Sequence, residues 1–497
     1  MRPIDAMNHS RTCLENSLRY AMVLVAALML PACTVGPDYV RPEAVAPDAW
    51  KELPPGKIAQ PSDDQSRGPW WNAFNDPTLD ALERDAEAAN QNLRVAEANY
   101  RQAQAAVAVA RAGLFPTLNG TASATRAGAG RSSGSGNSGN GANGSSTGGR
   151  GPVNAFQLGA AADWEVDLWG RVRREIESAG DSAQASAADL ENTRLSIQAD
   201  VAQNYLSLRV TDAAERVLQE TVAAYQRSLT LTQNRYNAGV AARAEVVQAQ
   251  TQLLGAQASL VDIKATRAQF EHALAILTGR PPADVSVSVT DTMPPMPDIP
   301  VTVPSQLLER RPDIAGAERR VAAANAQVGV ATAAFFPTVS LSANGGSAAS
   351  TLGSLFSAPA LFWSVGASLA QPIFDAGLRK AQREETLAQY DAAVATYRQT
   401  VLTAFQDVED QLANLRVLGE EASVQREQVR AARESVDLTI NQYQAGLVSF
   451  INVVTVQATL FAAQRSDLDL QNRRYTAAVA LVKALGGGFT TASLAAR

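Results

Sequence analysis

The sequence has very few of the residues that bind metals or attack substrates. It contains 2 histidines, His9 and His272, and 2 cysteines, Cys13 and Cys33. The body of the chain after residue 32 therefore has no cysteine–histidine pair and no zinc cluster. A Ser–His–Asp triad would depend on His272 alone, which sits in the helical pattern QFEHALAILTG and is interpreted as a structural histidine. The composition argues against an enzyme and predicts no metal or other cofactor.

Aromatic residues and net charge are also low. The chain has 43 basic and 49 acidic side chains in 497 residues, with 6% aromatics. No stretch is basic enough to indicate a nucleic-acid partner. Alanine is frequent, which favours closely packed helices over a thick globular core. The length suits two or three ordinary domains or one very extended molecule.

The first 32 residues resemble an export signal. Arg2, Arg11 and Arg19 precede the apolar run AMVLVAALMLPA, which is too short to span a bilayer but typical of a secretory signal. The run ends at Leu30-Pro31-Ala32-Cys33, which resembles the lipobox of bacterial lipoproteins and makes Cys33 the predicted lipidation site. The alternative is an ordinary signal with a coincidental cysteine. Thr34 replaces the aspartate that commonly retains such lipoproteins in the inner membrane, so the outer membrane is the predicted location.

One helical motif occurs twice in the sequence. RYNAGVAARAEVVQAQTQL starts at Arg235, and QYQAGLVSFINVVTVQATL starts at Gln442, 207 residues later. Gly239 and Gly446 stand where a helix C-terminus needs a left-handed residue, so each motif predicts the tip of an antiparallel helix pair. Residues 171–236 and 378–443 contain no proline, and at 1.5 Å per residue each segment would reach about 100 Å. The chain is thus predicted to be mainly α, built from two tandem structural repeats.

Each repeat also carries two alternating segments. Phe-Pro pairs at residues 115–116 and 336–337 end a helical pattern that begins near Asp76-Pro77 in the first repeat. The segments that follow alternate apolar with small or polar residues, as in TVSLSANG and LFWSVGASL. This pattern is typical of membrane strands and equally of half-buried soluble strands. A glycine- and serine-rich insert at residues 128–151 enlarges the first hairpin loop, which we expect to be extracellular. Four strands cannot close a barrel, whereas three copies would supply twelve.

Several long motifs in order resemble one family. They are CTVGPDYVRP from Cys33, WWNAFNDPTLDAL from Trp70, LLERRPDIAGAERRVAAANAQVGVATAAFFPTVSL from Leu307, QPIFDAGLR from Gln371, and ALGGG from Ala484. The chain resembles TolC-like outer-membrane factors, in the lipoprotein branch that serves resistance-nodulation-division pumps. The resemblance implies a homotrimer, with a twelve-stranded outer-membrane β-barrel continuous with a long α-helical coiled-coil tunnel. It implies a passive duct that exports drugs or other small toxic compounds, with a periplasmic adaptor and an inner-membrane pump as partners.

The resemblance also implies site residues. Gly239, Val240, Gly446 and Leu447 become adaptor-docking tips, and Glu245, Gln248, Ile451 and Thr455 line the periplasmic entrance constriction. Many relatives carry an aspartate ring at this constriction. Here the matching segments read Gln248-Ala249-Gln250 and Thr455-Val456-Gln457, so Glu245 is the nearest carboxylate. We therefore expect an entrance that attracts cations less than in those relatives.

These patterns divide the chain into predicted regions. They are a lipoprotein signal peptide (1–32), a lipidated extended arm (33–77), a first repeat (78–304) with a β-hairpin (117–168) and a helical hairpin (171–278), a second repeat (305–488) with a β-hairpin (338–374) and a helical hairpin (377–485), and a C-terminal tail (489–497). Three other readings stay open. They are a duct for a non-drug substrate, a periplasmic structural or adaptor lipoprotein, and an enzyme that uses Asp163, Glu165 and Asp167 as acid and base. In an efflux channel the same three acids would lie on one strand and face an aqueous lumen.

Overall fold

The computed structural model describes residues 34–44, 46–53, 69–128, 152–290, 292–299, 301 and 304–488. The predicted signal peptide, Cys33, most of the glycine-rich insert and the C-terminal tail lie outside these residues. The chain forms two compact units. Unit 1 comprises Met1–Val40, Gln104–Asp181 and Ala322–Asp391, and unit 2 comprises Arg41–Ala103, Ser182–Val321 and Ala392–Arg497. Each unit draws on both predicted repeats, and four helices have residues in both units.

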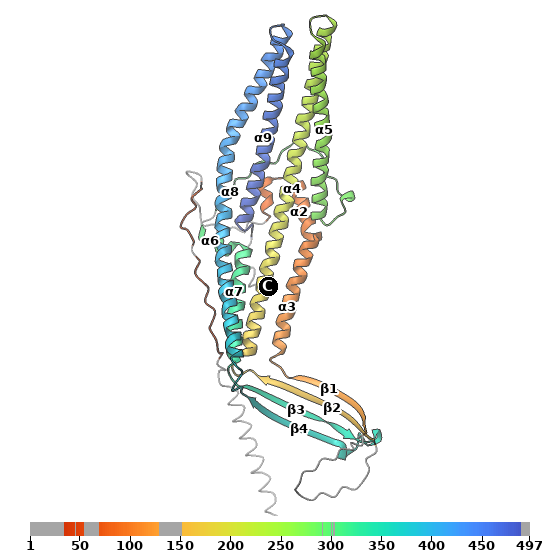
Figure 1. The fold of residues 1–497 in the computed structure, drawn as a ribbon, viewed down its shortest axis with the longest axis vertical. Helices are drawn as coiled ribbons and strands as arrows, with labels where there is room; N and C mark the ends of the chain where they lie inside the picture. Colours follow the sequence, from red (N-terminus) through yellow and green to blue (C-terminus); the bar gives the residue numbers. More distant parts are fainter. Residues whose placement is uncertain are drawn as a thin grey trace, which may run out of the picture. The chain divides into compact units, whose positions relative to one another are not determined.

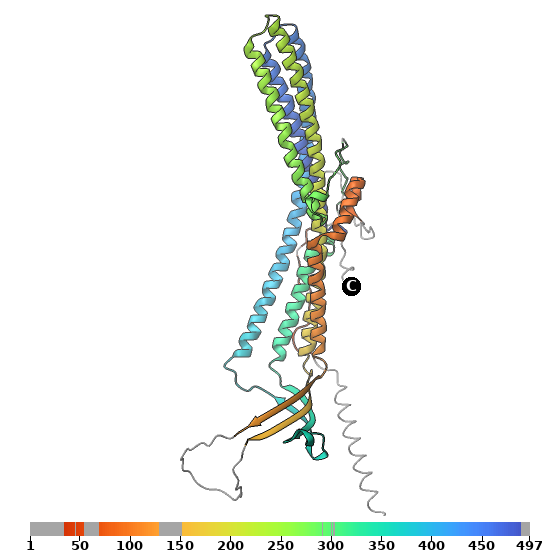
Figure 2. The same ribbon diagram turned by 90° about the vertical axis from the view of Figure 1, so that its right-hand side faces the viewer.

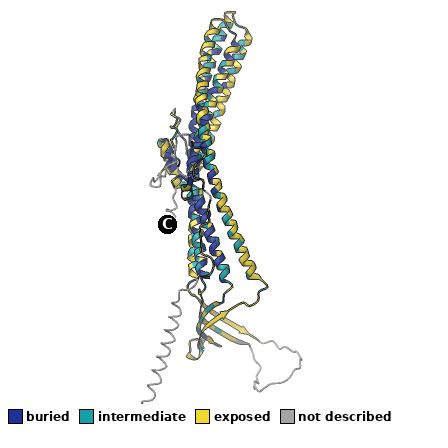
Figure 3. Cartoon of the chain, turned by 90° about the vertical axis from the view of Figure 1, so that its left-hand side faces the viewer, coloured by how far each residue is buried: buried dark blue, intermediate teal, exposed yellow. Residues whose placement is uncertain are grey.

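Unit 1 contains one antiparallel sheet in the order β1-β2-β3-β4 (Figure 1). The strands are β1 (Thr117–Ala127), β2 (Val153–Val166), β3 (Thr338–Ala349) and β4 (Leu361–Ala370). The central pairing of β2 with β3 joins the two repeats, with Trp164 opposite Leu341. Large apolar side chains of β4, such as Trp363 and Val365, are exposed in the single chain, and Figure 3 shows the strands as largely exposed. An apolar face of this kind needs a cover, and the described residues do not supply one.

Unit 2 holds most of two long helical hairpins, α4 (Arg171–Asn237) with α5 (Arg243–Leu277) and α8 (Leu378–Gln444) with α9 (Phe450–Ala484). In both views the two helices of each hairpin lie side by side (Figures 1 and 2). The repeats match in length, since α4 and α8 each have 67 residues and α5 and α9 each have 35. On α8, Val401, Phe405, Val408 and Leu412 repeat every three or four residues and are buried. No described helix combines the length and apolar composition needed to cross a bilayer.

The helix predicted from Pro77 to the first Phe-Pro pair is wrong as a single element. It is two helices, α2 (Pro77–Ala89) and α3 (Gln91–Ala112). Asp76 caps α2 by accepting bonds from the N–H groups of Thr78 and Leu79. The break falls at Asn90, whose Oδ1 accepts from the backbone N–H groups of Asn92 and Leu93, and whose Nδ2 donates to the Leu277 carbonyl at 2.8 Å. The side chain thus replaces the helical bonds that the backbone gives up there.

The second repeat breaks at the corresponding place. Helices α6 (Pro304–Arg310) and α7 (Pro312–Ala333) meet at Arg311, which donates to the Ala484 carbonyl at 3.2 Å. Gly279 and Gly486 end α5 and α9 with φ of +70° and +86°. A Cβ on either would collide with a backbone carbonyl at the break, that of Ala89 or Arg310. Glycine is required at both positions by conformation and by space.

The largest core lies in unit 2. Trp70, Trp71 and Phe74, which belong to the short helix η1 (Trp70–Phe74), pack with buried residues of α2, α4 and α9. Tyr475 and Val479 of α9 join this cluster, so the first repeat and the end of the second share one core. Buried residues run along these packed helices in Figure 3. Burial of these apolar groups fixes α4 against the C-terminal ends of α5 and α9.

Candidate functional site

The two hairpin tips have the same backbone. Gly239 has a φ of +74° and Gly446 a φ of +75°. At the first tip the Gly239 N–H donates to the Tyr236 carbonyl at 2.9 Å, and the Val240 N–H donates to the Arg235 carbonyl at 2.9 Å. Gly446 and Leu447 make the equivalent bonds at 3.0 and 2.9 Å. Both tips are Schellman motifs, so glycine stands where the sequence motif predicted a left-handed residue.

Each tip presents an exposed apolar side chain at the residue after its glycine. Val240 is 63% exposed and Leu447 is 76% exposed. A Cβ at Gly239 would meet nothing within 4 Å, and one at Gly446 would only reach the Arg235 guanidinium at 4.0 Å. Within one chain the tips are therefore unobstructed. Exposed apolar groups on a rigid turn are suited to contact with another protein.

The first tip is bonded to the second. Arg235 Nη1 donates to the carbonyls of Tyr443 and Gln444 at 3.0 and 3.3 Å, and its guanidinium lies 4.6 Å from the centre of the Tyr443 ring. The cation therefore adds a second bond to the Tyr443 carbonyl, which also accepts from the Gly446 N–H, and a bond to the Gln444 carbonyl at the negative end of α8. The Tyr443 hydroxyl donates to Glu245 Oε2 at 3.0 Å. Burial, and then the bond to the Glu245 carboxylate, raise the pKa of Tyr443.

The second tip has an apolar cluster beneath it. Phe450, Val453 and Val454 of α9 pack with Tyr443 and with Ala249 of α5. The Tyr443 and Phe450 rings are 5.5 Å apart. The first repeat has Arg243 where the second has Phe450, and its Tyr236 is 39% exposed whereas Tyr443 is 2% exposed. The two tips thus have the same turn, but at these positions an apolar cluster packs beneath the second tip only.

The four predicted entrance residues do not form one bonded cluster in the described chain. Glu245 is half-buried and binds Tyr443, and Gln248 is half-buried on the same helix. Ile451 and Thr455 are exposed on α9, and the Thr455 hydroxyl donates to the Ile451 carbonyl at 2.8 Å. Arg235 and Tyr443 were not among the predicted site residues. Arg235 stands beside the repeated tyrosine, but its partner is 208 residues away, which no local pattern shows.

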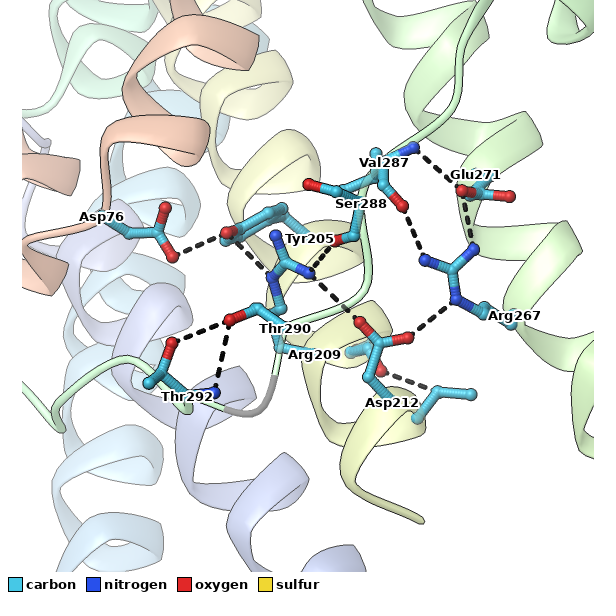
Figure 4. Close-up of polar contacts among 12 residues, drawn as sticks. Asp76, Tyr205, Arg209, Asp212, Arg267, Glu271, Val287, Ser288, Thr290 and Thr292 are labelled. Carbon is cyan, nitrogen blue, oxygen red and sulfur yellow. Dashed lines mark hydrogen bonds and ion pairs between the residues drawn. The ribbon is translucent and has the colours of Figure 1, made fainter. Parts of the chain in front are cut away.

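A second polar site lies midway along α4 (Figure 4). Asp212 accepts from Arg209 at 3.1 Å and from Arg267 of α5 at 2.7 Å. Arg209 Nε also donates to the Tyr205 hydroxyl at 2.9 Å, and this hydroxyl donates to Asp76 Oδ2 at 2.6 Å. Burial, and then the bond to Asp76, raise the pKa of Tyr205 to about 12. The network joins α2, α4 and α5.

The segment after α5 closes this network from the other side. The carbonyl of Ser288 accepts from Arg209 at 2.7 Å, and that of Val287 accepts from Arg267 at 2.6 Å. Glu271 binds both Arg267 and the Val287 N–H. Each buried charge in the network therefore has a partner, which is the condition for burying charge at a tolerable cost. The site is a structural tie between helices.

Two of the three acids considered for catalysis bind neighbouring arginines. Glu165 binds Arg171 at 2.9 Å, and Asp167 lies beyond the end of β2, where it accepts from the Arg173 backbone N–H at 3.0 Å. The expectation that all three acids sit on one strand facing water is therefore wrong for Asp167, which caps the start of α4. In the described residues no group of three histidine, cysteine or acidic side chains could hold a metal ion.

Comparison with known proteins agrees with this architecture. A model of the outer membrane efflux protein family matches residues 82–280 and 303–487. The pyoverdine export outer membrane protein OpmQ of Pseudomonas aeruginosa is 35% identical over 476 residues, covering 95% of this chain and 98% of the relative. The probable efflux pump outer membrane protein TtgC of Pseudomonas putida is 34% identical over 469 residues, or 94% of each chain.

Solved structures agree as well. The outer-membrane channel OprN superposes with a TM-score of 0.82 at 31% identity, covering 92% of this chain and 99% of that one. A crystal structure of CusC gives a TM-score of 0.79 at 27% identity, covering 92% and 100%. The chain therefore belongs to the outer membrane efflux protein family. It is the outer-membrane channel component of an efflux system.

Proposed function

We propose that three copies of the chain assemble into one closed channel, with a twelve-stranded barrel in the outer membrane and a periplasmic tunnel of long helices. The observation that carries this proposal is the four-stranded sheet of unit 1, in which β1 and β4 each pair on one side only within the described chain. Unpaired strand edges are not tolerated in lipid, so a membrane sheet must close on itself. The exposed apolar residues of β4 then face hydrocarbon.

The hairpin tips dock a periplasmic adaptor, which connects the channel to an inner-membrane resistance-nodulation-division pump. The exposed Val240 and Leu447 beside their glycines support this role. Glu245, Gln248, Ile451 and Thr455 line the periplasmic entrance. Glu245, which accepts from the Tyr443 hydroxyl, is the only carboxylate in this set, and a single carboxylate per chain supports an entrance with little attraction for cations.

The cargo is a drug or another small toxic compound. Relatives are named for export of pyoverdine, toluene and antibiotics, and one more distant relative for cations. The channel itself is a passive duct without catalytic residues or cofactor, and the pump supplies the energy. Pyoverdine export by OpmQ keeps a non-drug cargo as the second candidate, so a transport panel should include a siderophore beside dyes, antibiotics and solvents.

The chain is anchored twice in the outer membrane, by the barrel and by lipid on Cys33. Stable acyl anchoring generally needs more than one chain, which a triacylated cysteine provides. Incorporation of labelled palmitate should be lost in Cys33→Ser. Labelling that persists in this variant would contradict the lipid site.

The docking role is tested by a charge at the second tip. Gly446→Asp places a side chain on a residue with positive φ, where it strains the turn and intrudes on an approaching helix. Gly419→Asp adds the same side chain within α8, where a Cβ meets nothing within 4 Å. We expect Gly446→Asp to reach the outer membrane but to lose adaptor cross-linking and cargo export, while Gly419→Asp retains both. Normal cross-linking and export in Gly446→Asp would show that the glycine serves only to end the helix.

A further inference from the structure

The segment Thr34–Asp38 has no helix or strand, yet it is held residue by residue against unit 1. The Val35 N–H donates to the Trp169 carbonyl at 3.0 Å. Gly170 follows with a φ of +82°, and a Cβ there would come within 3.0 Å of the Thr34 Cα. Trp169 is itself fixed, since its Nε1 donates to the Pro337 carbonyl at 2.7 Å and its ring stacks on Phe336 at 5.0 Å.

The next contact is between two glycines. Gly36 has a φ of +102°, and a Cβ built on it would lie 2.6 Å from the Cα of Gly329 in α7. A Cβ on Gly329 would in turn lie 3.0 Å from the side chain of Arg174. Backbone therefore packs directly on backbone. Any side chain at Gly36 would push the segment off the helix and would also require a conformation that other residues rarely adopt.

The last two residues are held by polar side chains. Asn325, a buried residue of α7, donates from Nδ2 to the Pro37 carbonyl at 3.0 Å. Arg174, a buried residue of α4, binds Asp38 at 2.7 Å and Glu177 at 2.8 Å. A buried guanidinium needs acceptors, and the segment supplies one of them. Five consecutive residues thus fit a socket formed by the start of α4 and by α7.

The segment Thr34–Asp38 directly follows the proposed lipidation site. Thr34 directly follows Cys33, and consecutive Cα atoms are about 3.8 Å apart. Trp169 and Gly170 lie between the end of β2 and the start of α4. In the proposed channel this is the junction between a membrane strand and a periplasmic helix.

We propose that Thr34–Asp38 is a clasp that fixes the acylated N-terminus at this strand-to-helix junction, so that the acyl chains enter the membrane at the boundary of the barrel rather than from a flexible leader. This inference rests on the proposed lipidation of Cys33. The clasp itself uses only peptide and side-chain contacts, so its formation does not depend on the lipid.

The clasp is tested by distance measurements within unit 1. Spin labels are placed at Val40→Cys, which is exposed, and at Gly180→Cys, where a side chain has open space. The labelled protein is mixed with an excess of unlabelled chains, and the label separation is measured by pulsed electron paramagnetic resonance. We expect one narrow distance distribution. Gly36→Val should broaden it severalfold, whereas Glu43→Val, an exposed arm position outside the clasp, should leave it unchanged.

A Cys33→Ser version separates the two proposals. With palmitate labelling lost and the narrow distance retained, the socket rather than the membrane holds the segment, as proposed. The clasp is contradicted if the distance distribution broadens in Cys33→Ser. It is also contradicted if the distribution is already broad in the protein whose Cys33 carries palmitate. Neither result contradicts the lipid site. A chain that carries Cys33 but takes up no palmitate contradicts the lipid part of the proposed function, and with it the anchoring role of the clasp.

Discussion

Arg209 of α4 and Arg416 of α8 occupy equivalent positions of the two repeats, 207 residues apart, but they lie in opposite environments. Arg209 is 2% exposed, bonded to Asp212, and 4.7 Å from the centre of the Tyr205 ring. The Arg416 side chain is 36% exposed and binds Glu52 of the N-terminal arm at 2.7 Å. One helical register thus accommodates a buried ion network in one hairpin and a surface ion pair in the other.

The difference comes from the neighbours of each arginine. The second repeat has Leu412 and Gly419 where the first has Tyr205 and Asp212, so neither of these two acceptors has a counterpart beside Arg416. The arm covers that face instead. Trp50 packs on Phe405 at 5.9 Å, and the N–H groups of Lys51 and Glu52 donate to Glu409 at 2.8 and 3.0 Å. Tandem repeats can therefore keep their backbone while the forces that hold each copy diverge.

The same change at both arginines should expose this contrast most strongly. Arg209→Met leaves Asp212, Tyr205 and the Ser288 carbonyl buried with fewer donors, at a cost of about 3 kcal/mol or more in the free energy of unfolding. Arg416→Met removes only an exposed pair and should hardly move the unfolding midpoint. Guanidinium unfolding followed by helical circular dichroism compares them. Equal losses in the two variants would mean that burial of the network is irrelevant.

Asp212 is paired with two arginines, whereas one buried carboxyl of α2 has no hydrogen-bond partner within the described chain. Glu83 of α2 is 1% exposed, and neither of its oxygens has a hydrogen-bond partner within the described chain. Burial, then the carboxylates of Glu87 and Asp80, raise its pKa from 4.5 to about 9. The folded state then binds the proton more tightly than the unfolded chain, so stability should fall as pH rises from about 4.5 to about 9, by up to about 1.4 kcal/mol per pH unit.

Glu83→Gln cannot ionise and should flatten this dependence. Stability measured at several pH values in this window provides the test, with Asp85→Asn as the exposed control from the same helix. An unchanged slope in Glu83→Gln would show that Glu83 is ionised in the folded protein.

The two tips offer a smaller contrast. Tyr443→Phe removes the hydroxyl that donates to Glu245 and should cost about 1 kcal/mol. Tyr236→Phe, the matched change at the exposed tip tyrosine, should cost nothing measurable. Hydrogen exchange of the peptides around residues 236–250 and 443–455 reports local opening at each tip. Faster exchange in Tyr236→Phe than in Tyr443→Phe would reverse the proposed order.

The smallest effect is expected at the arm. The bond from Arg416 lowers the pKa of Glu52 below 4.5. A depressed carboxyl pKa contributes stability above its unfolded value, and this contribution is lost as pH falls through the folded value. At neutral pH the free energy of unfolding of Glu52→Gln should therefore be slightly lower than that of the unmodified protein. Below the lowered pKa the two proteins should be equally stable. Acid titrations of both proteins at low salt make the comparison, because salt screens an exposed pair.

Features set by local chemistry were predictable from the sequence. The left-handed Gly239 and Gly446, the proline-free helices and the alternating strands all follow from residue spacing. The break at Asn90 was missed because the residue lies within a continuous helical pattern, and its bond to Leu277 joins segments far apart in the chain. The contact of Arg235 with Tyr443 and the closure of the ion network by Val287 and Ser288 were missed for the same reason.

If one chain is a third of a closed channel, the native protein should contain three copies. The most direct test is the mass of the native protein extracted from the outer membrane in mild detergent. Three copies per particle, with β1 of one copy cross-linking to β4 of the next through paired cysteines, is the predicted result. A monomer that remains stably inserted in the membrane, or a particle of any other copy number, would contradict the account.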